Sequence, residues 1–286
     1  MLVPMHIGFT KMHGLGNDFA VFDAPAGAEP LSGAQLLRLA DRHTGIGFDQ
    51  ALILQAPRRH GTAVFYRIFN ADGTEVEQCG NGARCIAALL ASRGLAADGT
   101  VTLDSPAGLV RARTGPGGTV SVDMGPVRFD PRALPFEAPA EAERYRLEVG
   151  PETIEIGAVS IGNPHAVLVV ESVDAAPVAR LGPAIEAHAR FAKRVNAGFM
   201  QVLDRTCIRL RVYERGAGET LACGTGACAA VAVGCRWGLL DPMVTVKTRG
   251  GELSVTWAGG DEPIWLTGPA EIAFEGRVDI PSDPGH

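Results

Sequence analysis

The 286-residue chain contains one long internal repeat, at an offset of almost half its length. The segment Cys79-Gly-Asn-Gly-Ala returns as Cys223-Gly-Thr-Gly-Ala, 144 positions later (223 − 79). Each copy is followed by a second cysteine and a run of small apolar residues. A repeat unit of this size corresponds to a whole domain, whereas solenoid arrays repeat every 20 to 50 residues or so. The sequence therefore predicts two copies of one fold.

The repeat extends upstream of these two segments as single polar positions. Asn70 and Glu214, which are also 144 positions apart (214 − 70), each end a stretch of alternating apolar residues. Gly16-Asn17 recurs as Gly162-Asn163, and Gln50 is matched by Asn196, both at an offset of 146 (163 − 17 and 196 − 50). Recurrence at a nearly constant offset favours one shared function for these side chains. Asparagine at such positions is also a common turn former, and that alternative stays open for each of them.

Local patterns predict many strands and few helices. Val120–Asp123 and Val244–Lys247 alternate with the period of a strand, and Gly115–Gly118 is typical of a hairpin turn. Ser32 is a suitable N-cap for a helix through Arg42, and a further helix is expected after each repeated cysteine segment. We predict an α+β protein with two pseudo-symmetric halves from an internal duplication, each a curled, mostly antiparallel sheet around a central helix.

Prolines mark the expected division between the halves. Pro126, Pro131, Pro135 and Pro139 interrupt any regular pattern between positions 125 and 146. We therefore expect an N-terminal half at 1–125 and a C-terminal half that begins at 126. The polar segment 277–286 is rich in proline and glycine, so we expect a flexible tail there.

Composition excludes several functions. The formal net charge is −6 and basic residues form no run, so nothing favours binding to nucleic acid or to an anionic membrane. The longest apolar runs are too short to span a bilayer, and the N-terminus does not resemble a signal peptide, so we expect a cytoplasmic protein. The six cysteines form no Cys-x-x-Cys pair and the seven histidines form no ligand pattern, so we expect no metal. With only three lysines, the chain has few candidates for a pyridoxal cofactor.

The repeated cysteines suggest a chemistry. Cys79 and Cys223 each precede a predicted helix on a glycine turn, where free N–H groups and the helix dipole favour a thiolate or a bound carboxylate. If the halves pack about a pseudo-two-fold axis, the two thiols lie on opposite sides of one cleft. That arrangement suits removal of a proton from one face of a carbon and its return on the other. The alternative is that both are ordinary buried thiols, the interpretation we favour for Cys85, Cys228, Cys207 and Cys235.

Three charged or titratable residues complete the candidate site. Arg215 can grip a carboxylate with two parallel hydrogen bonds, and its neighbour Glu214 can accept from an amine. A surface ion pair is the alternative for these two. His165 could tune a neighbouring thiol, or it could be a core residue with its hydrogen bonds satisfied.

Many segments in order resemble the diaminopimelate epimerase family over residues 9 to about 276. The resemblance rests on Phe9-Thr-Lys-Met-His-Gly-Leu-Gly-Asn-Asp18, Gly45-Ile-Gly-Phe-Asp-Gln50, Phe69-Asn-Ala-Asp-Gly73, Gln78-Cys-Gly-Asn-Gly-Ala-Arg-Cys85, Gly162-Asn-Pro-His165, Arg194-Val-Asn-Ala-Gly-Phe-Met200, Tyr213-Glu-Arg-Gly-Ala-Gly-Glu-Thr220 and Ala222-Cys-Gly-Thr-Gly-Ala-Cys228. It implies a cofactor-independent isomerase that interconverts LL- and meso-2,6-diaminopimelate for lysine and peptidoglycan synthesis. It also implies a homodimer and a last strand, at about 266–276, that returns to the first half, which leaves 126–265 for the second.

The resemblance also implies roles for individual residues. Cys223 would accept the α-proton of the LL substrate and Cys79 would donate one from the opposite face. His165 and Glu214 would tune the thiols. The reacting carboxylate would bind at the two helix starts, and the rest of the substrate at the polar positions; together these are Gly80, Asn81, Gly224, Thr225, Asn17, Gln50, Asn70, Asn163, Asn196, Glu214 and Arg215. One departure is Phe274, which stands where the family commonly has a tyrosine at the dimer interface.

Three competing functions remain open from the residues. The first is a proline or hydroxyproline racemase or epimerase that uses the same two thiols, although such a substrate has no distal amino-acid end for Glu214 and Arg215 to hold. The second is a thiol hydrolase or acyltransferase with a single nucleophile and His165 as base. The third is a two-lobed binding module that takes diaminopimelate without exchanging its α-proton.

Overall fold

A computed structural model describes residues 6–24, 31–76 and 80–280, and it divides the chain into two compact units. Unit 1 comprises Met1–Val122 with Gly268–His286, and unit 2 comprises Asp123–Thr267. Strands β8 (Thr119–Pro126) and β17 (Pro263–Pro269) each run across a point of division. The domain limits expected from the sequence, 1–125 with about 266–276 and 126–265, stay a proposal.

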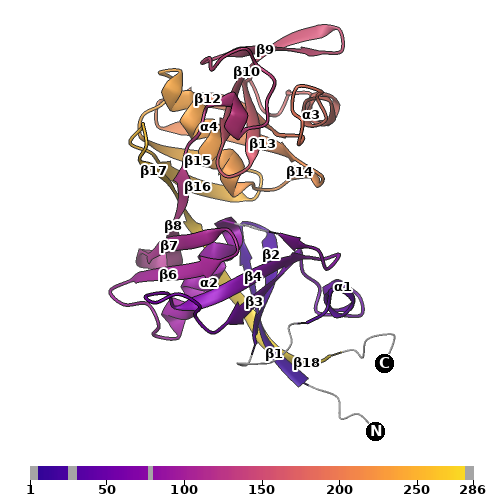
Figure 1. The fold of residues 1–286 in the computed structure, drawn as a ribbon, viewed down its shortest axis with the longest axis vertical. Coiled ribbons are helices and arrows are strands. Elements are labelled where there is room, and N and C mark those ends of the chain that lie inside the picture. Colours follow the sequence, from indigo (N-terminus) through magenta and orange to yellow (C-terminus); the bar gives the residue numbers. More distant parts are fainter. Residues whose placement is uncertain (1–5, 25–30, 77–79, 281–286) are drawn as a thin grey trace. The chain divides into compact units, whose positions relative to one another are not determined.

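The described residues of unit 1 form strands, α-helices and a short 3-10 turn (Figure 1). Its helices are α1 (Gly33–Ala40), α2 (Gly80–Ser92) and the short 3-10 turn η1 (Pro116–Gly118). Its strands are β1 (His6–Gly14), β2 (Asn17–Asp23), β3 (Gln50–Gln55), β4 (Val64–Asn70), β5 (Glu75–Val76), β6 (Thr100–Ser105), β7 (Gly108–Thr114), β8 (Thr119–Pro126) and β18 (Glu271–Asp279).

Unit 2 repeats this arrangement with its own strands and helices. Its helices are α3 (Val178–Glu186), α4 (Gly224–Arg236) and the 3-10 turn η2 (Pro131–Ala133). Its strands are β9 (Tyr145–Val149), β10 (Glu152–Ser160), β11 (Pro164–Val169), β12 (Asn196–Asp204), β13 (Cys207–Glu214), β14 (Gly218–Thr220), β15 (Met243–Thr248), β16 (Gly251–Thr256) and β17 (Pro263–Pro269).

The strand pairings confirm the duplication. In unit 1, β1–β2 is antiparallel, β2–β3 parallel, β3–β4 antiparallel, β4–β6 parallel and β6–β7 antiparallel. In unit 2, the pairs β10–β11, β11–β12, β12–β13, β13–β15 and β15–β16 follow the same succession of directions. The two short strands β5 and β14 also pair antiparallel with equivalent partners, β4 and β13. The predicted α+β class with two like halves is therefore confirmed.

Each sheet is covered by a helix on both faces. Because successive side chains of a strand point to opposite faces, Phe19 and Leu52 of unit 1 meet α2, whereas Phe22 and Ile53 pack with α1. In unit 2, Val212 meets α4 and the next residue, Tyr213, meets α3. Because both faces of β2 and β3 are buried, these strands contain continuous apolar runs. A strand with one solvent-exposed face would instead alternate apolar and polar residues.

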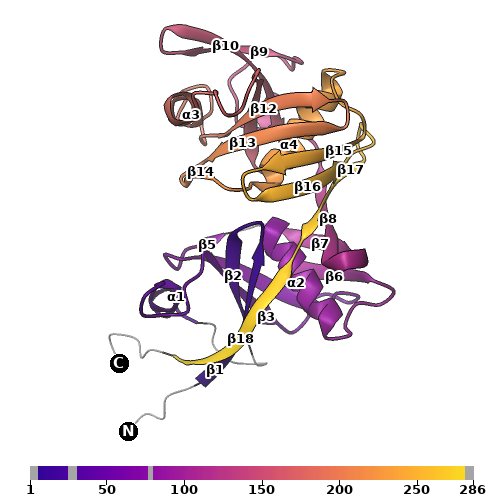
Figure 2. The ribbon, with the colours of Figure 1, turned by 180° about the vertical axis from the view of Figure 1, so that it is seen from behind.

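The repeated helices α2 and α4 are the central helices predicted from the sequence. Most residues of both helices are buried, including Cys85 and Cys228. Most of their residues are alanine, glycine or cysteine. Because these side chains are small, the surrounding strands can pack closely against each helix. Figures 1 and 2 show α2 and α4 each against the sheet of its own unit.

Three sequence expectations need correction. The helix capped by Ser32 is confirmed with a full capping box, but it ends at Ala40 rather than Arg42. Cys207 and Cys235 are only half-buried, so they are not core thiols. Arg277 still pairs with Gly8 in the β1–β18 ladder, which runs to Asp279, so the C-terminal strand extends into the expected tail (Figure 2). Residues 281–286 lie outside the described residues.

The described residues contain neither a membrane-spanning helix nor a metal-ligand cluster. No helix among them is long and apolar enough to cross a membrane. Likewise, residues 6–24, 31–76 and 80–280 contain no group of three or more His, Cys, Asp or Glu side chains placed to hold a metal ion.

Candidate active site

Cys223 caps the N-terminus of α4. Its Sγ accepts a hydrogen bond from the N–H of Gly226 at 3.4 Å and lies 3.6 Å from Oγ1 of Thr225. The side chain is buried. Burial and the negative charge of Glu214 raise the pKa of the Cys223 thiol well above its usual value, against the opposing hydrogen bonds from Thr225 and Gly226. Cys223 is therefore a protonated thiol at neutral pH in this structure.

The other repeated cysteine, Cys79, lies outside the described residues, as do Glu77 and Gln78. Its proposed role as proton donor therefore stays a prediction. The two residues after it are described: Gly80 and Asn81 form the buried first turn of α2. Gly224 and Thr225 form the equivalent turn of α4. Both helix starts thus occupy the positions that the repeat predicts, each in its own unit.

In unit 2, Asn163 and His165 form a hydrogen-bonded pair beside the start of α4. The Nδ2 group of Asn163 donates to Oγ1 of Thr225 at 3.3 Å, and its Oδ1 lies 3.0 Å from Nε2 of His165. Because an amide oxygen only accepts, Nε2 carries the ring proton. Burial and the positive charge of Arg215 lower the pKa of His165 to about 3, so the ring is neutral. The contact of His165 is thus to Asn163, and its Nδ1 has no hydrogen-bond partner among the described residues.

Asn196 fixes the backbone at Arg215. It is buried at the start of β12, where its Nδ2 donates to the carbonyl of Pro164 at 3.0 Å and its Oδ1 accepts from the N–H of Arg215 at 2.9 Å. The Arg215 guanidinium donates to the carbonyl of Lys193 at 3.0 Å. Glu214 accepts from the hydroxyl of Thr220. Three of the predicted residues, at positions 196, 214 and 215, are thereby gathered at one end of the β12–β13 pair.

Unit 1 gathers the other four described polar residues into two pairs. Asn81 donates through Nδ2 to Oδ1 of Asn17 at 3.1 Å, which joins the start of α2 to the β1–β2 turn. Gln50 and Asn70 are cross-strand neighbours, and Nε2 of Gln50 donates to Oδ1 of Asn70 at 3.0 Å. Oδ1 of Asn70 thus accepts from Gln50, whereas Oε1 of Gln50 is buried without a hydrogen-bond partner in the described part of the chain.

The same hydrogen-bonded connection between a hairpin turn and the central helix occurs in both copies of the fold. Asn17 bonds to Asn81 in unit 1, and Asn163 bonds to Thr225 in unit 2; each bond connects a hairpin turn to the second residue of the central helix. The turn before Asn17 has Leu15 and Gly16 at positive φ, 57° and 86°. Two such residues in succession form the tight hairpin connection that matches strand twist. The backbone therefore delivers Asn17 to a fixed point beside α2.

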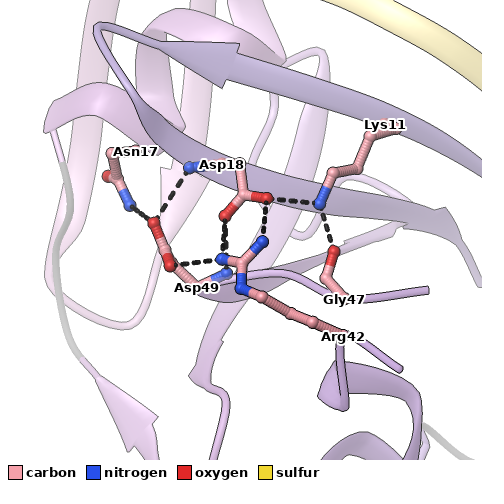
Figure 3. Close-up of polar contacts among 6 residues, drawn as sticks. All are labelled: Lys11, Asn17, Asp18, Arg42, Gly47 and Asp49. Atoms are coloured by element: carbon pink, nitrogen blue, oxygen red, sulfur yellow. Dashed lines mark hydrogen bonds and ion pairs between the residues drawn. The ribbon is translucent and has the colours of Figure 1, made fainter. Parts of the chain in front are cut away.

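Sequence reasoning missed two sets of residues. Glu186, at the end of α3, is buried; its carboxylate accepts from the N–H of Gly216 at 3.1 Å and pairs with Arg194 at 2.8 Å. It thus anchors the loop that follows Arg215, and nothing in its sequence context distinguishes it. The second set surrounds Asn17, where Asp49 accepts from Nδ2 of Asn17 at 3.1 Å (Figure 3). Asp49 lies directly before Gln50, which is the only signal that could have suggested it.

Comparison with known proteins identifies the family. The family model for diaminopimelate epimerase matches residues 9–129 and 157–273. The chain belongs to the diaminopimelate epimerase family. Its relatives include the diaminopimelate epimerase of Thioalkalivibrio sulfidiphilus, 56% identical over 278 residues, and that of Nitrosomonas europaea, 54% identical over 276 residues. Each match covers 96% of this chain and 100% of the relative.

Solved structures of other proteins share the fold. A hydroxyproline epimerase from Agrobacterium vitis has a TM-score of 0.69 at 17% identity, with 98% of this chain and 94% of that one covered. A phenazine biosynthesis protein of the PhzF family from Bacillus anthracis also has a TM-score of 0.69, at 16% identity, with coverage of 96% and 99%. At these identities the similarity is one of fold alone. The fold thus occurs in diaminopimelate epimerase family members and in proteins that carry other names.

Proposed function

We propose that the chain is a cofactor-independent isomerase that interconverts LL- and meso-2,6-diaminopimelate in lysine and peptidoglycan precursor synthesis. The observation that carries the proposal is the buried thiol of Cys223 at the start of a central helix, in the segment that repeats that of Cys79. Family membership and the names of the relatives support the substrate.

The raised pKa of Cys223 suits the first step. A proton α to a carboxylate is weakly acidic, so a useful base must itself have a high affinity for a proton. Burial raises the pKa of Cys223, and Glu214 raises it further. Once it has lost its proton, this thiolate is a stronger base than one in water. The N–H of Gly226 and the helix dipole stabilise the negative charge of the Cys223 thiolate before it takes the α-proton.

The reaction balances with one thiolate and one thiol and no other reagent. Because burial favours the protonated form of Cys223, this thiol must first release its proton to solvent. The Cys223 thiolate takes the α-proton and becomes a thiol, and the electron pair of the C–H bond passes into the carboxylate as an enediolate. The Cys79 thiol then delivers its proton to the opposite face of the carbon and is left as a thiolate. The N–H groups at Gly80–Asn81 and Gly224–Thr225 would stabilise the enediolate. In the reverse direction the two cysteines exchange roles.

The remaining polar residues would bind the rest of the substrate. Arg215 would pair with the distal carboxylate and Glu214 with the distal ammonium group, with Asn17, Gln50, Asn70, Asn163 and Asn196 as further hydrogen-bond partners. The hydrogen bonds within these groups support this role, because each side chain is already held at a fixed point. His165 would act by orienting Asn163 and by its neutral ring beside Arg215.

The test is proton NMR of LL- and meso-diaminopimelate with the reduced protein in D2O. We expect loss of the α-proton signal and interconversion of the two stereoisomers without added cofactor. Cys79→Ser and Cys223→Ser should each abolish interconversion, whereas the half-buried control Cys235→Ser should keep it. Exchange with proline or hydroxyproline instead would replace the substrate, and activity that survives loss of one repeated cysteine would favour a single-nucleophile enzyme. Binding of diaminopimelate without exchange would leave a binding module.

We further propose a cytoplasmic homodimer. Phe274 of β18 is 51% exposed and packs edge-to-face on Phe9, with 5.9 Å between ring centroids. Ile272 of the same strand is also exposed. An exposed aromatic and aliphatic pair on one strand suits contact with a second copy. Analytical ultracentrifugation should give a dimer that Phe274→Asp weakens; a monomeric wild-type protein would contradict the proposal.

A further inference from the structure

A network of charged side chains lies beside Asn17 in unit 1, and Asp49 connects Asn17 to it (Figure 3). Oδ2 of Asp49 accepts from Nδ2 of Asn17 at 3.1 Å and from the N–H of Asp18 at 3.1 Å. On the other side of the amide, Oδ1 of Asn17 accepts from Asn81 at 3.1 Å. A carboxylate only accepts hydrogen bonds, so Asp49 holds the Asn17 amide with its nitrogen toward β3 and its oxygen toward α2.

Arg42 holds the Asp49 carboxylate and connects it to Asp18. NH2 of Arg42 donates to Oδ1 of Asp49 at 2.7 Å and to Oδ1 of Asp18 at 2.7 Å, and NH1 donates to Oδ2 of Asp18 at 2.9 Å. Lys11 pairs with Asp18 at 2.6 Å and also donates to the carbonyl of Gly47. The side chains of Lys11 and Asp18 are only 11% and 17% exposed, so solvent screens this pair far less than an ordinary surface pair.

Asp18 and Arg42 keep their charges over a wide pH range. Burial would raise the pKa of Asp18, but hydrogen bonds from Arg42 and Lys11 outweigh it and hold that pKa well below the usual value. The hydrogen bond with Asp18 raises the pKa of Arg42 further above its already high value. The ion pair between Asp18 and Arg42 therefore persists over that range.

The second copy of the fold lacks this network. Pro164 follows Asn163 where Asp18 follows Asn17, and Val195 precedes Asn196 where Asp49 precedes Gln50. There the equivalent amide, that of Asn163, is oriented by a neutral histidine instead. The duplicated backbone alone thus does not require the charges, which points to a local role at Asn17.

We propose that Asp49 is a positioning residue that fixes the amide of Asn17 for the substrate, with Arg42 and Asp18 holding Asp49 in place. The inference rests on the proposed function, since it takes Asn17 to bind diaminopimelate. Because Asp49 lies directly before Gln50, the same network fixes the start of β3, and with it a second proposed substrate-binding side chain.

The deciding variant is Asp49→Asn, which replaces one carboxylate oxygen by an NH2 group. In the variant, the remaining side-chain oxygen at position 49 is expected to face the charged Arg42. The new NH2 group then faces Nδ2 of Asn17 and the N–H of Asp18, which are both donors and cannot accept a hydrogen bond from it. The Asn17 amide must then turn over or move. We expect KM for diaminopimelate to rise about tenfold, the value of one hydrogen bond, while kcat changes much less.

Asp23→Asn is the matched control. Asp23 lies at the other end of β2 and pairs with Arg93 through two bonds of 2.9 Å, so its loss also removes a carboxylate–arginine pair of unit 1. It should lower thermal stability without a change in KM. If Asp49→Asn keeps the wild-type KM and loses only stability, as the control does, the network is merely structural and the inference is wrong.

A second measurement separates this inference from the proposed function. The side-chain amide resonances of Asn17, assigned by their loss in Asn17→Ser, should show slow hydrogen exchange in the wild type and fast exchange in Asp49→Asn. If the wild type does not epimerise diaminopimelate, the proposed function fails on that assay alone. Unchanged exchange at Asn17 in the variant would refute the positioning role whatever the substrate is.

Discussion

Gly226→Ala tests whether catalysis depends on the placement of the Cys223 thiol. Gly226 lies in the first turn of α4, and its N–H donates to Sγ of Cys223. A Cβ at this position would lie 2.8 Å from Cγ2 of Val212 and 3.2 Å from both Cβ and Sγ of Cys223. Nonbonded carbon atoms prefer about 3.5 to 4.0 Å. Val212 is a buried, β-branched residue with little freedom to turn away, so the thiol must move by several tenths of an ångström.

The expected effect on the reaction is larger than the effect on folding. Overpacking of this kind costs about 1–3 kcal/mol, partly offset by about 1 kcal/mol from the better helix propensity of alanine. The net change lowers Tm by a few degrees. Displacement of a reacting group by about 1 Å can reduce the rate about a hundredfold, so a smaller shift should reduce kcat about tenfold. KM should change little, because Gly226 is not a proposed substrate ligand.

Gly234→Ala is the control within the same helix. A Cβ there would lie 2.3 Å from Cδ1 of Leu240 and 2.7 Å from its Cγ, a tighter clash than at Gly226. The control should therefore lose at least as much stability, measured by thermal unfolding, and keep its kcat, measured by NMR of the diaminopimelate stereoisomers. Wild-type kcat in Gly226→Ala, or an equal loss in Gly234→Ala, would refute the argument that thiol placement is what Gly226 protects.

Three further predictions concern stability. His165 has a pKa of about 3 in the folded protein and about 6.5 in the unfolded chain, so the neutral ring contributes to the free energy of unfolding above pH 6.5 and this contribution is lost as the pH falls toward 3. Urea titrations should therefore show that the free energy of unfolding of His165→Gln falls less steeply over this pH range, by up to about 1.4 kcal/mol per pH unit. Glu186→Gln should lower the free energy of unfolding by about 1 kcal/mol, because the pair with Arg194 is lost but the Arg194 side chain is 57% exposed and stays solvated; equal stability of the variant and the wild type would contradict this. Ser32→Ala should lower it by about 1 kcal/mol through loss of the N-cap of α1, and an unchanged urea midpoint would show that the cap contributes nothing.

The repeat predicted more of the fold than local patterns could. Equal spacing of Asn17 with Asn163 and of Gln50 with Asn196 requires equal numbers of residues in the turns and strands between them. The strand pairings show the same equality. Phe19 pairs with Gln50 in the parallel β2–β3 ladder, and His165 pairs with Asn196 at the equivalent position of the parallel β11–β12 ladder. Because the backbone is duplicated, residues with equal spacing in the sequence lie at equivalent positions in the two units. The matched polar residues could therefore be paired from the sequence without knowledge of the sheet.

Contacts between unrelated segments could not be predicted in this way. Arg42, Asp18 and Asp49 are ordinary charged residues in the sequence, and only the folding of three segments brings them together (Figure 3). Glu186 is likewise an inconspicuous glutamate until β13 places Gly216 beside it. Such ion pairs depend on long-range geometry and leave no periodic signal. Solvent exposure is subject to the same limit, as the half-buried Cys235 shows.

The two copies show which properties duplication keeps and which it does not. Asn17 and Asn163 hold equivalent backbone positions and make equivalent bonds to the central helices, because register and turn length fix both. Their second partners differ in kind: a carboxylate held by an arginine in unit 1, and a neutral, buried imidazole in unit 2. Register is set by the number of residues between turns, which a substitution does not change, whereas a side-chain partner can be replaced by a single substitution. Equivalent positions in the two halves are therefore reliable guides to where the proposed ligand-binding side chains lie, but the charge around each must be established in each half separately.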